Sequence, residues 1–167
     1  MSIYHGQRRA TLQNIVERIE TICRAHLGIA DFDNGNIKVF GEPNYKYPLA
    51  FLEDIIFIEE GEKKVTQTYT VTLNIVDLQP ASDDRQAKTQ VRDKVFETYN
   101  EVKNQLEQEK YPSFGNKRVS PGTLVMTDEF SKGRAIQCQG TFTINCDAVV
   151  TPAQDLPSIF PSLYANT

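Results

Sequence analysis

The sequence predicts an α+β domain in which two helices pack on one face of a mainly antiparallel sheet of two long hairpins. The first observation is residues 65–76, VTQTYTVTLNIV, where apolar and polar residues alternate as in a half-buried strand. The second is a similar alternation over residues 134–149. The third is a pair of segments, 11–26 and 83–109, in which apolar residues recur every three or four positions, as on an amphipathic helix. The predicted order is therefore helix, hairpin, helix, hairpin.

Length and composition are typical of one soluble domain. The chain has 167 residues, of which 40% are apolar and 24% are charged, which is enough for a single core. No stretch offers the roughly 20 apolar residues of a membrane span, and the N-terminus lacks the apolar segment of a secretory signal, so we expect a protein made in a cytoplasm. The net charge is −4 and the basic residues form no cluster, so we expect no specific nucleic-acid binding.

The first predicted helix covers residues 11–26. Gly28 is its expected C-cap, and Ile29 is placed to pack back on the last turn. One apolar stripe runs along the helix, and it consists of Leu12, Ile15, Val16, Ile19, Ile22 and Cys23.

Residues 30–48 are rich in turn-forming residues, and we expect turns with a short strand at 37–40. Acidic and amide residues at 31–36 have some likeness to a calcium-binding loop. Val39 and Phe40 inside that loop, and the missing flanking helices, favour a turn.

The apolar run at 51–58 predicts a strand that pairs antiparallel with 65–76, with Glu53 and Asp54 marking a bulge or a break. The long strand would extend about 40 Å. One side is expected to form the core, and the other to meet water or a partner. The core side carries Val65, Tyr69, Val71, Leu73 and Ile75, and the other side carries Thr66, Thr68, Thr70, Thr72 and Asn74.

The second predicted helix follows Ser82, a good N-cap, and has Asp83 and Asp84 in its first turn, where the helix dipole favours negative charge. It would be about 40 Å long, so we expect it to lie alongside the long strand. Its narrow apolar stripe consists of Ala87, Val91, Val95, Tyr99, Val102 and Leu106, with Phe96 beside it.

A second hairpin is predicted from residues 123–130 and 134–149, with Gly140 marking a bulge or a close backbone approach. The domain should therefore extend over residues 1–150. The remaining residues, 151–167, contain three prolines and isolated apolar residues, and we expect an extended tail. That tail would pack on its own sheet, dock on a neighbouring subunit or stay mobile.

Residues that carry catalysis are sparse. His5 and His26 lie near no candidate nucleophile, and no glycine-rich phosphate loop occurs. The three cysteines have no close pairing, and we interpret them as buried thiols. We therefore expect no enzyme activity, no cofactor and no metal site.

The order helix 12–26, hairpin 51–76, helix 83–109 and hairpin 123–149 resembles the tail-terminator and neck (head–tail joining) proteins of tailed bacteriophages. The resemblance is one of architecture and size and covers most of the chain. It implies a structural virion protein, assembled in the host cytoplasm as a homo-oligomeric ring, most simply a hexamer. The ring would cap the tail tube and join it to the head, with DNA passing through the lumen and with tail tube, sheath and neck or connector proteins as partners.

Two regions are expected at subunit contacts in such a ring: the hairpin tip at 59–64 and the C-terminal tail. The residues concerned are Glu59, Glu60, Glu62, Lys63, Lys64, Ile159, Phe160, Leu163 and Tyr164. The alternative is a small α+β module that binds a protein or a small ligand between sheet and helices. An enzyme of unfamiliar type is the third hypothesis.

Overall fold

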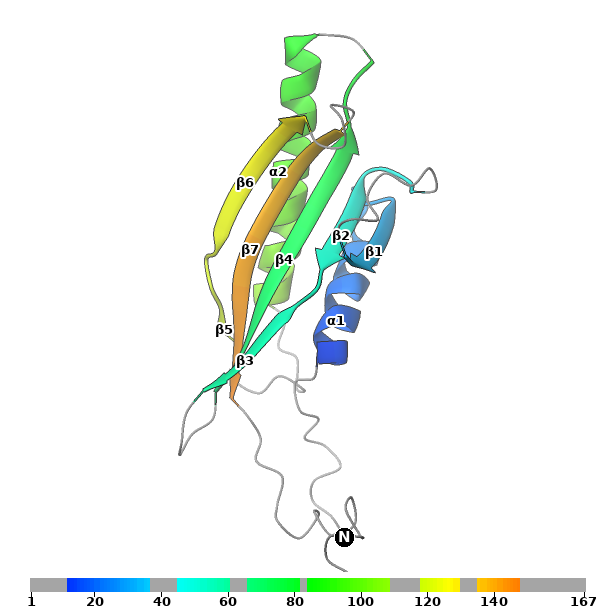
Figure 1. The fold of residues 1–167 in the computed structure, drawn as a ribbon. Coiled ribbons are helices and arrows are strands. Elements are labelled where there is room, and N and C mark those ends of the chain that lie inside the picture. The colour runs from blue at the N-terminus through cyan, green and yellow to red at the C-terminus, as the bar shows by residue number, and fades with distance from the viewer. Residues whose placement is uncertain are drawn as a thin grey trace, which may run out of the picture.

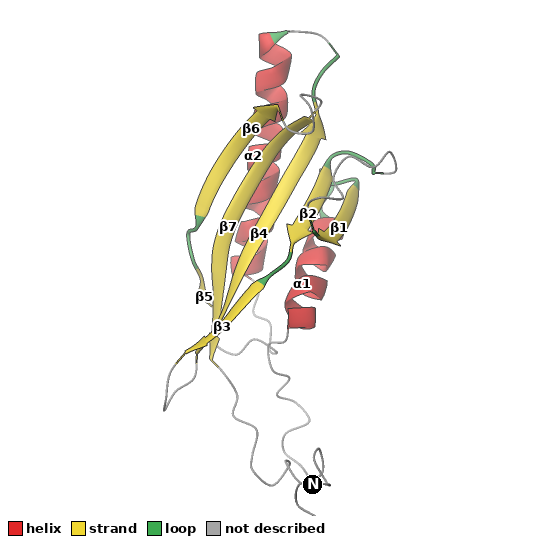
Figure 2. Cartoon of the chain, viewed as in Figure 1, coloured by secondary structure: helices red, strands yellow, loops and turns green. Residues whose placement is uncertain are grey.

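The structure is a computed structural model, and it describes residues 12–36, 45–60, 66–81, 84–108, 118–129 and 135–147. Within these residues the chain forms two helices and seven strands (Figures 1 and 2). In chain order they are α1 (Leu12–Ala25), β1 (Asp31–Gly35), β2 (Leu49–Glu53), β3 (Ile56–Glu60), β4 (Thr66–Leu78), α2 (Arg85–Gln108), β5 (Arg118–Val119), β6 (Thr123–Glu129) and β7 (Ala135–Asp147). The predicted α+β class is confirmed.

Strands β4 and β7 form the centre of the sheet. Each has 13 residues, and they pair antiparallel along their whole length, from Thr66 opposite Asp147 to Leu78 opposite Ala135. β2 and β3 both pair with β4, whereas β5 and β6 both pair with β7. The two predicted hairpins are therefore confirmed, and they meet through their longest strands.

Both helices lie on the same face of this sheet (Figure 1). α2 packs along β4 and β7, as the similar lengths of helix and strand predicted, and α1 packs beside it over β1. The core between the layers is one cluster of buried side chains that includes Ile15, Ile19, Tyr99, Leu73 and Phe142. The predicted apolar faces of both helices and of the long strand thus meet in a single core, except that Leu12 of α1 and Phe96 of α2 are exposed.

The first strand, β1, was not predicted, because its sequence Asp-Phe-Asp-Asn-Gly is typical of a turn. It pairs parallel with β2, and Phe32 in its middle is buried in the core. The backbone pairing and this one aromatic side chain outweigh the low strand propensity of its neighbours. The calcium-like pattern is therefore part of an edge strand, and the strand expected at 37–40 lies outside the described residues.

The ends of the helices differ in detail from the prediction. Asp84, expected in the first turn of α2, is instead its cap: Asp84 Oδ1 accepts a hydrogen bond from the Gln86 N–H at 2.9 Å. Ser82, the expected cap, lies outside the described residues. After α1, the Gly28 N–H donates a hydrogen bond to His26 Nδ1 at 3.0 Å. Gly28 does not have the left-handed backbone expected of a glycine C-cap, and the His26 side chain accepts the hydrogen bond at this helix end instead.

The predicted break at Glu53–Asp54 is confirmed, one residue further along. β2 ends at Glu53 and β3 begins at Ile56, and both continue along the same side of β4. The two halves have opposite environments. The first four residues of β2 are buried, whereas every residue of β3 is exposed.

Candidate functional site

One end of the sheet has strand tips that reach past the ends of α1 and α2 (Figure 1), whereas Tyr69, Ile144 and Cys146 just behind these tips are buried in the core. It comprises residues 56–60 of β3, 66–70 of β4, 143–147 of β7 and the short strand β5. We call these residues the arm. Every residue of β3 is exposed, and so is Arg118 of β5, so the arm offers two strand edges to a partner.

Strand β3 gives the arm three large exposed apolar side chains. Ile56, Phe57 and Ile58 are 61%, 45% and 47% exposed. Phe57 lies on the helix side of the sheet, where its ring centre is 5.0 Å from that of Tyr69. Ile56 and Ile58 lie on the opposite face, beside threonines of β4. An exposed edge strand that carries apolar residues on both faces is a typical protein-binding element.

The face opposite the helices carries a double row of threonines across β4 and β7. The Thr68 hydroxyl donates to Asn145 Oδ1 at 2.8 Å, and the hydroxyls of Thr72 and Thr141 are 3.0 Å apart. These side chains are half-buried and uncharged. The threonine rows are therefore uncharged, and their hydroxyls bond partly to one another.

Further along the same face, the threonine row leads into a buried polar cluster. Asn74 is 0% exposed and donates hydrogen bonds to Glu53 Oε1 at 2.8 Å and to the Phe51 carbonyl at 3.4 Å. Gln139 donates to the same Glu53 oxygen at 2.8 Å, and Gln137 donates to Asn74 Oδ1. This cluster ties β2, β4 and β7 together through their side chains.

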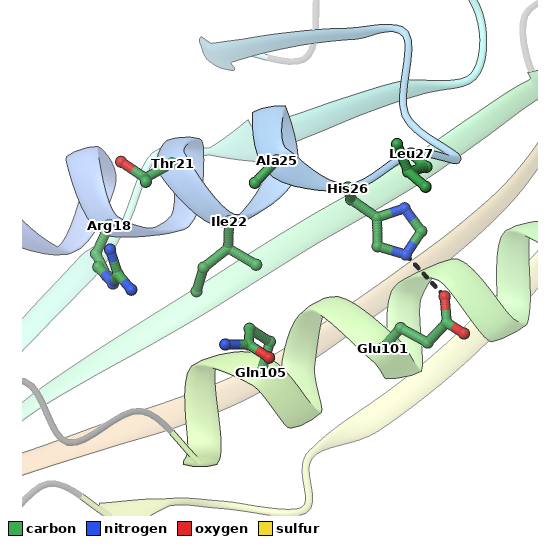
Figure 3. Close-up of a pocket in the computed structure, with 8 residues that line it drawn as sticks. All are labelled: Arg18, Thr21, Ile22, Ala25, His26, Leu27, Glu101 and Gln105. Carbon is green, nitrogen blue, oxygen red and sulfur yellow. Dashed lines mark hydrogen bonds and ion pairs between the residues drawn. The ribbon is translucent and has the colours of Figure 1, made fainter.

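A groove of about 680 Å³ lies between α1 and α2 on the other side of the molecule. Figure 3 shows His26 of the α1 end directed at Glu101 of α2, with His26 Nε2 2.7 Å from Glu101 Oε2. Because Nδ1 accepts from the Gly28 N–H, Nε2 is the nitrogen that donates to the carboxylate. The groove also contains the fully exposed Leu27 and the buried Ile22.

The largest shifts in pKa belong to groups in the core, Cys23, Cys138 and Tyr99. Burial, with the nearby Glu20 charge, raises the pKa of the Cys23 thiol to about 12, and burial also raises the pKa of Cys138 to about 12. Burial raises the pKa of the Tyr99 hydroxyl to about 12. All three cysteines are buried and free, as predicted. In the described part of the chain, no three His, Cys, Asp or Glu side chains gather as metal ligands.

Of the predicted contact residues, the structure describes Glu59 and Glu60. Both are exposed at the end of β3, on the arm. The others lie outside the described residues: Glu62, Lys63, Lys64, Ile159, Phe160, Leu163 and Tyr164.

The sequence did not predict the exposure of Ile56, Phe57 and Ile58, because they belong to the apolar run at 51–58, whose first residues are in the core. It also missed Arg118, which lies on the opposite edge of the arm. The sequence did contain a signal for this exposure. Three consecutive apolar residues in one strand place apolar side chains on both faces of the sheet, whereas an antiparallel sheet with one core face needs them on that face only.

Neither helix in the described ranges is long and apolar enough to cross a membrane. The comparisons with protein-family models and with curated proteins give no match for this chain. The geometry of the arm, the threonine face and the groove is therefore the basis for assigning a function.

Proposed function

We propose that this protein is a structural assembly protein that forms a homo-oligomeric ring, of the kind found at the tail end or neck of tailed bacteriophages. The observation that carries the proposal is the arm, with three large apolar side chains exposed on the edge strand β3. The order of helices and long hairpins, which resembles tail-terminator and neck proteins, supports the same assignment.

Exposed apolar side chains on an unpaired edge are a liability for a protein that stays monomeric. Such edges attract other strands, and soluble proteins usually cover them, shorten them or place charges on them. Here Ile56 and Ile58 lie beside uncharged threonines of β4, so a partner surface can cover these apolar side chains without desolvating a charge between them. Burial of β3 in a subunit contact would remove the liability.

A ring of such subunits would cap the tail tube and present a surface to the neck or connector, with DNA passing through its lumen. The net charge of −4 supports this role, because a negatively charged protein repels DNA phosphates rather than gripping them. The partners proposed are further copies of this chain, tail tube and sheath proteins and neck proteins. Assembly would take place in the host cytoplasm, and the mature location would be the virion.

The test is the mass of the purified full chain in solution. Sedimentation velocity and native mass spectrometry should show one closed oligomer, near six times the 18.9 kDa subunit for a hexamer. Replacing Ile56 and Ile58 by threonine should shift the distribution toward monomer, because burial of both side chains is lost. The matched control is Val125→Thr, at an exposed valine on β6 outside the arm, which should leave the mass unchanged. A wild-type chain that stays monomeric at every concentration would contradict the proposal.

The groove between the helices favours a second candidate, a binding module for a small ligand or a peptide segment. It combines an apolar floor at Ile22 with the polar pair His26 and Glu101, a mixture typical of ligand sites. This function predicts that a peptide or small-molecule library gives hits whose binding is lost in Glu101→Lys, at an exposed residue of the groove. Hits unaffected by that substitution would exclude the groove as their site.

A further inference from the structure

We infer that the two edges of the arm bind each other between neighbouring copies, so that β3 of one subunit pairs with β5 of the next and the sheet continues around the ring. This inference rests on the proposed ring and names the surfaces that would form its contact. The partner is thus a second copy of this chain.

The two edges lie at the same end of the sheet. In the arm the strand order is β3, β4, β7 and β5, and one lateral row runs from Ile58 through Thr68 and Asn145 to Arg118. Among the described strands, β3 pairs with β4 alone and β5 pairs with β7 alone. Both outer edges therefore have backbone groups directed away from their sheet partners, at matching heights along the sheet.

The strand directions suit this contact. β3 is antiparallel to β4, β4 to β7 and β7 to β5, so β3 and β5 run in opposite directions within one subunit. Successive copies in a ring present the same element in the same sense, so β3 of the next copy is again antiparallel to β5. The new pair therefore continues the antiparallel arrangement of the arm.

The charges on the two edges are complementary. β3 ends in Glu59 and Glu60, whereas Arg118 is the first residue of β5, and all three are exposed. Glu60 and Arg118 are both on the face opposite the helices, since their lateral neighbours Thr66 and Asn145 are on that face. If neighbouring copies met without a stagger, Arg118 would lie opposite Ile58 of the next copy. A stagger of two residues between the copies places Arg118 opposite Glu60 instead, and every side chain keeps its own face. Opposite charges that face each other across strands stabilise the pair.

A symmetrical contact between two β3 edges is the competing arrangement. It would bring the acidic ends of both strands, Glu59 and Glu60 of each copy, into the same two-stranded contact. It would also leave Arg118 outside the contact and stop at a dimer. A β3–β5 contact instead joins unlike edges and can close into a ring in which neither edge stays open.

The experiment is a charge swap in the full chain, read out by sedimentation velocity over a range of concentrations. Glu60→Lys and Arg118→Glu should each weaken the subunit contact about tenfold, because each places like charges opposite each other. The double variant E60K/R118E should restore the wild-type mass, because the pair is present with its signs exchanged. Matched controls are Glu97→Lys and Arg85→Glu on exposed positions of α2, which should leave the assembly unchanged.

The outcomes separate this inference from the proposed function. A ring that forms but ignores Arg118→Glu would show that the β5 edge is outside the contact, and only the inference would fall. A dimer that responds to Glu60→Lys alone would indicate the symmetrical β3 contact, and a ring-forming function would fall with the inference. Circular dichroism of each variant checks that the fold is unchanged, as expected for exposed residues.

Discussion

Tyr99 of α2 lies directly over Gly140 of β7. A Cβ atom added at Gly140 would be 1.9 Å from Tyr99 Cζ and 2.1 Å from its hydroxyl oxygen. The glycine therefore lets the helix approach the centre of the sheet, and of the two readings the sequence left open for Gly140, the close approach is the one observed.

Gly140→Ala should destabilise the protein by about 3 kcal/mol, because the tyrosine ring must move within a packed core. Urea unfolding followed by circular dichroism measures the change. The control is the double variant with Tyr99→Ala, in which the added methyl group meets a cavity. Its cost should be clearly smaller than the sum of the two single costs, and simple additivity would show that the two residues are not in contact.

Asn74→Ala should cost about 3 kcal/mol of unfolding free energy. The substitution removes a donor from the Glu53 carboxylate and leaves the Gln137 amide without its acceptor in a buried setting. Chemical denaturation compares it with Thr68→Ala, which removes one half-buried hydrogen bond of the same face and should cost about 1 kcal/mol. Equal effects for the two variants would show that the buried cluster contributes no more than the threonine row.

The protein should lose stability as the pH rises above about 9. The folded-state pKa values of Cys23 and Cys138 are raised to about 12, whereas unfolded thiols ionise near 8.5. Between these values the unfolded chain has released protons that the folded chain still holds, so the free energy of unfolding falls, by at most about 1.4 kcal/mol per pH unit for each thiol. Tyr99 adds to this loss above about pH 10, because its folded pKa is also raised.

Urea unfolding at pH 7 and pH 10.5 measures that loss. In Cys138→Ala the decrease between the two pH values should be smaller than in the wild type, because one raised thiol pKa is gone. An undiminished decrease would contradict the role of this thiol. Thiol-labelling reagent should also modify the native protein slowly and all 3 cysteines rapidly in urea.

Deletion of residues 151–167 should weaken assembly about tenfold while the fold is retained, because the predicted contacts of Ile159, Phe160, Leu163 and Tyr164 are lost. Sedimentation velocity measures the assembly, and circular dichroism checks the fold. The full-length variant with all four residues changed to serine separates the loss of side chains from the loss of chain length. Normal assembly of the truncated protein would show that the tail lies outside the subunit contacts.

Periodicity in the sequence was sufficient for both helices, for the long strands and for the α+β class. The alternation of Tyr69, Val71 and Leu73 with threonines identifies the core face of β4, because a strand side chain repeats its direction every second residue. The prediction from local residue types was wrong at β1, where turn-forming residues form a strand because they pair with β2. Of the candidate site, the sequence identified the acidic end of β3 but neither its exposed apolar residues nor Arg118.

Sequence periodicity shows which residues share a face, whereas contacts between distant segments establish which faces and edges are covered. Ile58 and Leu52 belong to the same apolar run, yet Leu52 is buried beneath the helices while Ile58 is 47% exposed on the arm. Arg118 and Ile58 are 60 positions apart in the chain and become opposite edges of one row only through β4 and β7. Burial and edge exposure depend on contacts between distant segments, which the periodicity of one segment does not contain.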